Sequence, residues 1–244
     1  MYSTTNHPTA YRMVPRAMLG DLKPTPFRQW IQLERYAGKR DYVTATTADL
    51  AEVWGGVSVQ AARTGLRTLS GAGWVVQDGN GLPTGTHRLW IPWFQVTDPD
   101  DFLITADDYT RQRMNGGRLE DERTRSFREA AMTAKGTEYP YVHVPVAVVD
   151  QAATDTDLLV WTAMRSYLGP EGISTSAATI GKRAGITRRP TIATATKRLV
   201  ESGLLLPTGT TGRKGVQGYT VPEHLAGTYR VRKSLPSVPM AAAA

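Results

Sequence analysis

The stretch TIGKRAGITRRPTIATATKRLVESG, residues 179–203, decides the fold and predicts two short helices joined by a tight turn. Ile180 and Ala184 fall on one face of the first helix. Gly185 then supplies the left-handed residue that ends this helix. Thr187 is the expected N-cap of the second helix, because its hydroxyl can accept a hydrogen bond from a free backbone N–H.

The second helix predicted in this stretch has one apolar and one basic face. Ile192, Ala195 and Leu199 recur at helical spacing and are expected to point inward. Pro190 lies in the first turn, where its missing N–H removes no helical bond. A short helix, a glycine turn and a basic second helix form the helix-turn-helix pattern, whose second helix enters the major groove of DNA. The residues predicted to contact DNA on this helix are Arg188, Arg189, Thr191, Thr194, Lys197 and Arg198.

Basic residues on either side of this helix extend the predicted contact surface. Lys182 and Arg183 on the preceding helix are expected to reach backbone phosphates. Arg213 and Lys214 lie between glycines at the tip of a following hairpin, where they are expected to touch an adjacent groove or a phosphate. For all of these cations the alternative is a solvated surface charge.

Composition and charge favour the same class of partner. The chain has 244 residues, of which 41% are hydrophobic, enough for one large domain or two small ones. The net charge is +7 and the isoelectric point is near 9.7, which favours a polyanionic partner. Most basic residues are arginines, which suit bidentate contacts to phosphate and guanine, although a GC-rich genome gives the same bias.

The composition also excludes several classes of site. The chain has no cysteine, which excludes disulfides, thiolate nucleophiles and cysteine-ligated zinc and fits a reducing cytoplasm. Residues 1–15 lack the apolar core of a signal peptide, and no apolar run approaches the roughly 20 residues that cross a bilayer. We therefore expect a soluble, cytoplasmic protein without a membrane segment.

The chain repeats itself at a nearly constant offset. FRQWIQLERYAG, residues 27–38, returns as LLVWTAMRSYLG, residues 158–169, and each Trp, Tyr and Gly has a counterpart. We infer an internal duplication from these matched residue types. The further matched pairs are residues 14–15 with 144–145, 49–51 with 179–181, 56–58 with 185–187, and 69–74 with 199–204.

Each copy is predicted to contain three helices followed by a β-hairpin. A Ser/Thr-rich connection after the first helix holds the N-cap of the next helix. Apolar strands flank the Gly-rich segments 77–86 and 207–218, which is the pattern of a hairpin. The expected N-caps are Thr46 or Thr47 in the first copy and Ser174 or Ser176 in the second.

Three helices and such a hairpin make a winged helix-turn-helix, and the chain resembles the tandem winged-helix proteins encoded by plasmids and phages, among them plasmid replication initiators. The resemblance is topological and covers roughly residues 12–92 and 142–222. It implies a mainly α fold with small β-hairpins (α+β), built from two winged helix-turn-helix domains in tandem. The expected parts are a first domain over residues 1–97, an acidic helical linker over 98–140, a second domain over 141–233 and a disordered tail over 234–244.

The segment between the copies differs from them in charge. Residues 98–140 carry a net charge of about −3, against about +4 for residues 1–97 and about +6 for residues 141–244. Within this segment, RLEDERTRSFREAAMTAK predicts a helix in which Asp121 and Arg125 pair at i,i+4. A solvated connector helix and a dimerisation or partner-docking helix both fit this sequence.

The outward face of the corresponding helix in the first copy is less basic. Gly65 in the middle of this helix costs roughly 1 kcal/mol against alanine, which indicates close backbone packing or a tolerated weakness. Contact with DNA and contact with a protein are both open for this helix. The residues concerned are Gln60, Arg63, Thr64 and Arg67 on the helix and Arg88 on the hairpin after it.

The sequence gives no support to catalysis. Residues 207–215 lack the order of glycines and Gly-Lys-Ser/Thr that defines a phosphate loop. Asp155 and Asp157 are better explained as an N-cap and a first-turn acid of a helix than as a catalytic pair. We therefore predict no enzyme activity, no metal site and no cofactor. The histidines are scattered, without a second ligand at helical spacing: His7, His87, His143 and His224.

These patterns predict a sequence-specific, non-enzymatic protein that binds double-stranded DNA. Two winged helices would enter successive major grooves roughly 34 Å apart, so that one chain acts as a built-in pseudo-dimer. The expected role is initiation or control of replication on a mobile element, or transcription regulation, by a monomer or weak dimer on nucleoid or mobile-element DNA. The alternative is a protein-binding accessory factor, such as a phage recombination directionality factor that docks on a serine integrase or another replication or recombination protein.

Overall fold

The residues described by the computed structural model fall into two halves. The first half is residues 11–92 apart from 39, 41 and 80, and the second half is residues 141–226 apart from 170, 171 and 213–215. Residues 95–100, 102 and 103 are described as well. Both halves mix α and β structure, with helices packed against small antiparallel sheets.

The first half begins with a strand and ends in a three-stranded antiparallel sheet of order β2-β4-β3. Thr46 and Asp49 form a capping box that starts α2, as predicted for Thr46. Ser58 starts α3 by accepting a hydrogen bond from the N–H of Ala61. The elements in chain order are β1 (Tyr11–Pro15), the 3-10 helix η1 (Arg16–Met18), α1 (Pro24–Ala37), β2 (Tyr42–Thr46), α2 (Thr47–Val53), α3 (Val59–Gly71), β3 (Val76–Asp78) and β4 (Thr86–Trp90).

The second half has a similar order of elements and a smaller sheet. Ser176 starts α8 by accepting a hydrogen bond from the N–H of Thr179, as predicted. A single bridge between Ile173 and Tyr219 stands where the first half has the strand β2. The elements in chain order are β5 (Tyr141–Pro145), α6 (Val146–Gln151), α7 (Asp155–Arg165), α8 (Ala177–Ala184), α9 (Arg189–Glu201), β6 (Leu206–Gly212), β7 (Val216–Thr220) and α10 (Glu223–Ala226).

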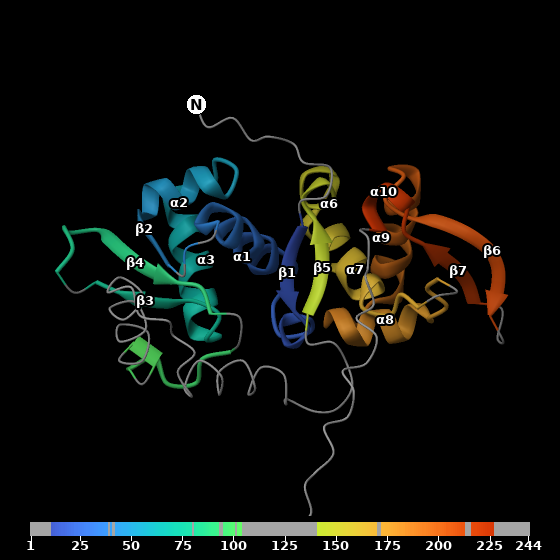
Figure 1. Ribbon diagram of the computed structural model, residues 1–244, viewed down its shortest axis with the longest axis horizontal. Helices are drawn as coiled ribbons and strands as arrows, with labels where there is room; N and C mark the ends of the chain where they lie inside the picture. Colours follow the sequence, from blue (N-terminus) through green and yellow to red (C-terminus); the bar gives the residue numbers. More distant parts are fainter. Residues whose placement is uncertain are drawn as a thin grey trace, which may run out of the picture.

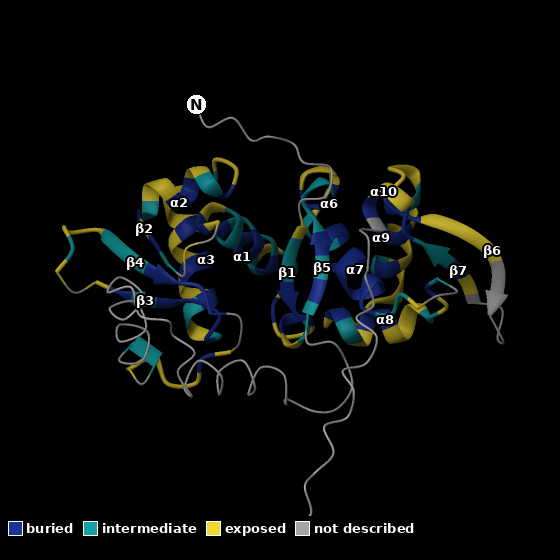
Figure 2. Ribbon diagram, in the orientation of Figure 1, coloured by how far each residue is buried: buried dark blue, intermediate teal, exposed yellow. Residues whose placement is uncertain are grey.

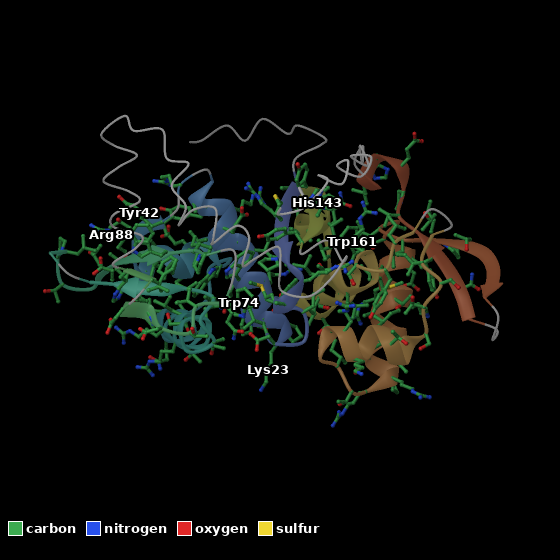
Figure 3. All side chains as sticks on the ribbon, turned by 60° about the horizontal axis from the view of Figure 1, so that its bottom comes forward. Lys23, Tyr42, Trp74, Arg88, His143 and Trp161 are labelled. Atoms are coloured by element: carbon green, nitrogen blue, oxygen red, sulfur yellow. The ribbon has the colours of Figure 1, made fainter. Side chains whose placement is uncertain are left out.

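The positions of the elements agree with the repeat in the sequence. The helices α3 and α9 both have 13 residues, and they start 130 residues apart. The indole N–H of Trp30 donates to the carbonyl of Trp74 at 3.0 Å, and that of Trp161 donates to the carbonyl of Leu204 at 3.0 Å. These four residues are two matched pairs of the repeat, and Figure 3 shows Trp74 and Trp161 inside different halves.

The two halves meet along the antiparallel strand pair β1–β5 and the packed helices α1 and α7. Met13 pairs with His143, which is its own counterpart in the repeat, and Tyr11 pairs with Pro145 while Pro15 pairs with Tyr141. The register is therefore the same when read from either strand, which is the property of a local two-fold axis between identical surfaces. Figure 1 shows this pair at the centre, with the two hairpins at opposite ends.

One large hydrophobic core runs through both halves, and a smaller cluster of Val76, Trp90 and Val96 stands apart from it. The fully buried side chains of the large core include Trp30 and Ile31 on α1 and Leu159 and Trp161 on α7. Figure 2 shows buried residues on α1, β5 and α7 near the centre of the molecule and also on α3 and β4. The halves are thus repeats in sequence that share one apolar interior. The composition alone allowed either one large domain or two small ones.

Two differences from the expected fold concern connections. Residues 42–46, expected to be only a connection, form the strand β2, which pairs with β4 because Val43 and Ala45 are apolar and buried. The described chain also contains the short helices α6 and α10, which the repeat did not predict. The predicted linker helix and the predicted tail lie outside the described residues.

Candidate nucleic-acid interface

The helix α8, the turn after it and α9 form the predicted pair of short helices. Gly185 ends α8 in the left-handed conformation, with φ of +65°. The turn also packs against the first half, because a Cβ on Gly185 would lie 2.9 Å from the carbonyl oxygen of Gly20. The turn of the second half is therefore held by a loop of the first half.

The inner face of α9 is the one that the sequence predicts. Ile192, Ala195 and Leu199 are at most 1% exposed and belong to the shared core. Thr196 is also buried, and its hydroxyl faces the sulfur of Met164 on α7. Burial of this stripe fixes which side of α9 is left for solvent or for a partner.

The first turn of α9 carries two exposed arginines. Arg188 is the N-cap and Arg189 is the first helical residue. Among the described residues, no acidic side chain lies within ion-pair distance of either one. The prediction that Thr187 caps this helix is wrong: the helix starts one residue later, and its N-cap makes no side-chain hydrogen bond. The positive end of the helix dipole and two free guanidinium groups thus lie together at the surface.

The other residues of the second half that the sequence predicts to contact DNA differ in their exposure and in their contacts within the protein. Lys182 and Thr194 are exposed, and Thr191 is half-buried. Arg183 is half-buried, donates to the Tyr167 hydroxyl at 3.2 Å and lies 5.0 Å from the centre of that ring. Arg213 and Lys214 lie outside the described residues.

Two cations of α9 are already paired within the protein. Lys197 lies 3.7 Å from Glu201 one turn later, an exposed pair of small energetic weight. Arg198 is held in a bidentate ion pair by Asp157 on α7, at 2.7 and 3.0 Å. This contact raises the pKa of Arg198. It also occupies the Nε and one terminal nitrogen of the guanidinium, which an external phosphate would otherwise bind. We therefore leave Arg198 out of the candidate interface.

The sequence places Asp157 at the start of α7 but does not show its partnership with Arg198. The N-cap of α7 is Thr154 rather than Asp155, and Asp157 is the third helical residue of a capping box with it. The pattern Thr-x-x-Asp at residues 154–157 is the signal that identifies this cap. Nothing in that pattern indicates which arginine reaches the carboxylate.

The corresponding surface of the first half has a different charge. Residues 47–71 contain two acidic and two basic residues, whereas residues 177–201 contain one acidic and six basic residues. Glu52 is exposed on α2 where Lys182 is exposed on α8. Hydrogen bonds from Thr46 lower the pKa of Asp49, so that its carboxylate keeps its negative charge. The predicted contact residues Gln60, Arg63, Thr64 and Arg67 are all exposed on α3.

The hairpin of the first half offers no free cation at its predicted position. Arg88 lies 3.2 Å from the carboxylate of Asp78 and 5.2 Å from the centre of the Tyr42 ring. Figure 3 shows Tyr42 and Arg88 side by side at one end of the molecule. Arg88 therefore stabilises the sheet β2-β4-β3 in this structure.

The two hairpins also differ in how they pack on their helices. In the first half Gln77 donates to the Ser70 hydroxyl at 2.7 Å, which ties the hairpin to α3. The counterparts in the second half are Pro207 and Val200, whose side chains cannot make this bond. A groove of about 500 Å³ lies there between α8, α9 and the hairpin β6–β7, with Tyr219 on one wall.

Among the described residues there is no cluster of three or more metal-ligating side chains. Within the same part of the chain, no helix combines the length and the apolar character that crossing a membrane requires. His87, His143 and His224 lie in β4, β5 and α10. The exposed cations of α8 and α9 described above are Lys182, Arg188 and Arg189.

No model of a known protein family matches the chain, and no curated protein matches it. The charge and geometry of its own residues are therefore what support a function.

Proposed function

We propose that each half is a winged helix-turn-helix and that the second half binds double-stranded DNA through α9. In this proposal α9 lies in the major groove, and the hairpin β6–β7 lies beside it over the phosphate backbone. The order of three helices and a hairpin in each half supports the assignment. The buried stripe of α9 supports it as well, because it leaves the basic face outward.

The observation that carries the proposal is the pair Arg188 and Arg189. Both are exposed at the start of α9, and no acid among the described residues neutralises them. Arginine at this end of a helix can reach guanine edges, while the helix dipole attracts a phosphate. Lys182 on α8 adds a third exposed cation to the same helix pair.

The biological role that we propose is that of a sequence-specific DNA-binding protein of a mobile element. Control or initiation of replication comes first and transcription regulation second, and neither needs a catalytic group of this chain. The second half supplies most of the affinity, because the first half has a balanced charge on α2 and α3.

The test is DNA binding measured by fluorescence anisotropy, with a duplex selected from a random pool by the purified chain. Replacing Arg188 and Arg189 with alanine should weaken binding by at least about 30-fold, because each of the two lost contacts is worth about 1–3 kcal/mol. The slope of log K against log salt should fall by about 1 for each of the two arginines that neutralises a phosphate, and so by about 2 if both do.

The matched control is the double variant R63A/R67A, which removes two exposed arginines from the corresponding helix α3. If the second half supplies most of the affinity, this control variant should change the affinity for DNA less than 5-fold. Equal affinity and equal salt slope for wild type and R188A/R189A would remove DNA binding by α9 as the function.

A second candidate function is favoured by the acidic residues of α2. Exposed Asp49 and Glu52 fit a basic protein partner better than a phosphate backbone. On this alternative the chain is an accessory factor, such as a recombination directionality factor that docks on a serine integrase. Failure of the purified chain to retard any duplex at 0.1 M salt, together with direct binding to a purified integrase, would favour this alternative.

A further inference from the structure

We propose that Asp157 and Arg198 act as positioning residues that set the orientation of α9 and thereby the affinity for DNA without touching DNA. The inference rests on the proposed function of α9. It gives Arg198, which the sequence assigns to the contact surface, a different task inside the protein.

The geometry of the pair is that of an anchor. The Nε and one terminal nitrogen of Arg198 donate to the two carboxylate oxygens of Asp157, at 3.0 and 2.7 Å. The Asp157 side chain is 1% exposed and that of Arg198 is 37% exposed. Two parallel hydrogen bonds fix both the distance and the angle between α9 and α7, which one bond does not do.

The carboxylate that receives these bonds is itself held in place. The Asp157 side chain accepts from the backbone N–H of Thr154 at 3.1 Å, and the Thr154 hydroxyl accepts from the N–H of Asp157 at 3.2 Å. Arg198 also approaches the Thr154 hydroxyl, at 3.4 Å. The anchor point is therefore the capped first turn of α7 rather than a mobile side chain.

The same turn of α7 is fastened to the first half. Asp155 lies 2.9 Å from Arg28 and accepts from the Thr25 hydroxyl at 2.7 Å, and both of these residues belong to α1. Arg28 also donates to the carbonyl of Ala152 at 2.7 Å. The helix α9 is therefore held against α7. In turn α7 is held against α1, which packs at the centre of the molecule.

The first half lacks this device. The repeat places Pro26 opposite Asp157 and Thr68 opposite Arg198. Thr68 bonds within its own helix, to the carbonyl of Thr64 at 2.9 Å. The ion pair therefore exists only beneath the helix with the basic surface, where the orientation of the exposed arginines matters for binding.

The two explanations predict opposite changes in DNA affinity for one variant. Asp157→Asn removes a negative charge next to a DNA-binding helix, so simple electrostatics expects tighter binding to the selected duplex. A positioning role expects the reverse, because asparagine keeps the shape but loses the charged bidentate contact. We expect binding about 10-fold weaker than wild type with an unchanged salt slope, because no phosphate contact is lost.

Two further variants define the comparison. Arg198→Lys keeps the charge but cannot form two parallel bonds, and it should weaken binding to a similar extent as D157N. Glu201→Gln is the matched control, because it removes an exposed acid from α9 and leaves the anchor intact. It should bind as tightly as wild type or slightly more tightly. D157N binding as tightly as E201Q overturns the inference.

Amide hydrogen exchange separates this inference from the proposed function. D157N, measured well below its unfolding temperature, should exchange faster than E201Q in α9 and equally in α3. Equal exchange in α9 of the two variants overturns the positioning role. If wild type binds no DNA, the proposed function fails, and the exchange data still decide whether Asp157 holds α9.

Discussion

His143 lies on the local two-fold axis, opposite Met13, and its ring stacks on Tyr11 with the ring centres 4.6 Å apart. Burial lowers the pKa of His143 below the ordinary value of 6.5, and the nearby Arg165 lowers it further. The folded protein therefore binds a proton at this position less readily than the unfolded chain. Protonation of His143 acts against the contact between the halves.

This difference in pKa predicts how stability depends on pH. The contribution of His143 is fully present above pH 6.5 and is lost as the pH falls from 6.5 through the lowered pKa of the folded state. Denaturant titrations between pH 7 and pH 5 should show a decreasing free energy of unfolding. His143→Gln should flatten this decrease, and an unchanged slope would contradict the prediction. Burial raises the pKa of Glu34 above 4.5, so its effect, of opposite sign, begins at the acidic end of the range.

Arginines show how much of the candidate site could be predicted from residue types. The spacing predicts correctly that Arg188 and Arg189 are exposed. It predicts the same for Arg198. This side chain instead pairs with Asp157, which lies on a helix about 40 residues earlier in the chain. The spacing also misses the pairing of Arg88 with Asp78. Helical periodicity gives the face of a residue, whereas an ion pair depends on which other element packs there.

At the scale of elements, the turns between paired helices explain two of the glycines. Gly185 adopts a left-handed conformation and touches the backbone of Gly20 in the other half. Gly56, its counterpart after α2, is also left-handed, with φ of +75°, but has nothing within 4 Å of a Cβ. The same conformation therefore occurs with and without a close neighbour.

This pair of glycines makes a matched test of the contact between the halves. Gly56→Ala should lower the free energy of unfolding by about 1–2 kcal/mol, the usual penalty for a left-handed residue with a Cβ. Gly185→Ala should lower it by more, because the methyl group also meets the Gly20 carbonyl at 2.9 Å. Thermal or urea unfolding of both variants measures the difference. Equal effects would show that the Gly20 contact adds nothing.

The helices were easier to predict than the strands. A stripe such as Ile192, Ala195 and Leu199 identifies a buried helix face on local information alone. A Cβ on Gly65 would collide with the buried side chain of Gln29. This contact explains why a glycine stands in the middle of that helix. The strand β2 gives no comparable signal, since its pairing with β4 joins residues at least 40 positions apart.

At the scale of the whole molecule, the sequence repeat defines two halves of the chain, and these halves share one large hydrophobic core. Buried residues of α1 and α7 belong to one continuous cluster, and the strands β1 and β5 come from different halves. The repeat was visible because matched residues keep their order along the chain. The shared interior was not, because the sequence does not show which surfaces of two repeats face each other.

A shared core predicts a single cooperative unfolding transition for the whole chain. Calorimetry should give a van't Hoff enthalpy equal to the calorimetric enthalpy, since neither half buries its apolar face without the other. Gly56→Ala in the first half should then shift the melting of both halves together. Two separate transitions, of which the variant shifts only one, would contradict the prediction.

The symmetric strand pair at the centre also fixes how the protein responds to dilution. Two separate subunits related by the same axis would fall apart at low concentration, and their occupancy of a two-part ligand would drop steeply. Here both partners of the axis belong to one polypeptide, so their contact does not depend on protein concentration. The two partners also differ in surface charge, since Glu52 is exposed in the first half at the position that matches the exposed Lys182 of the second.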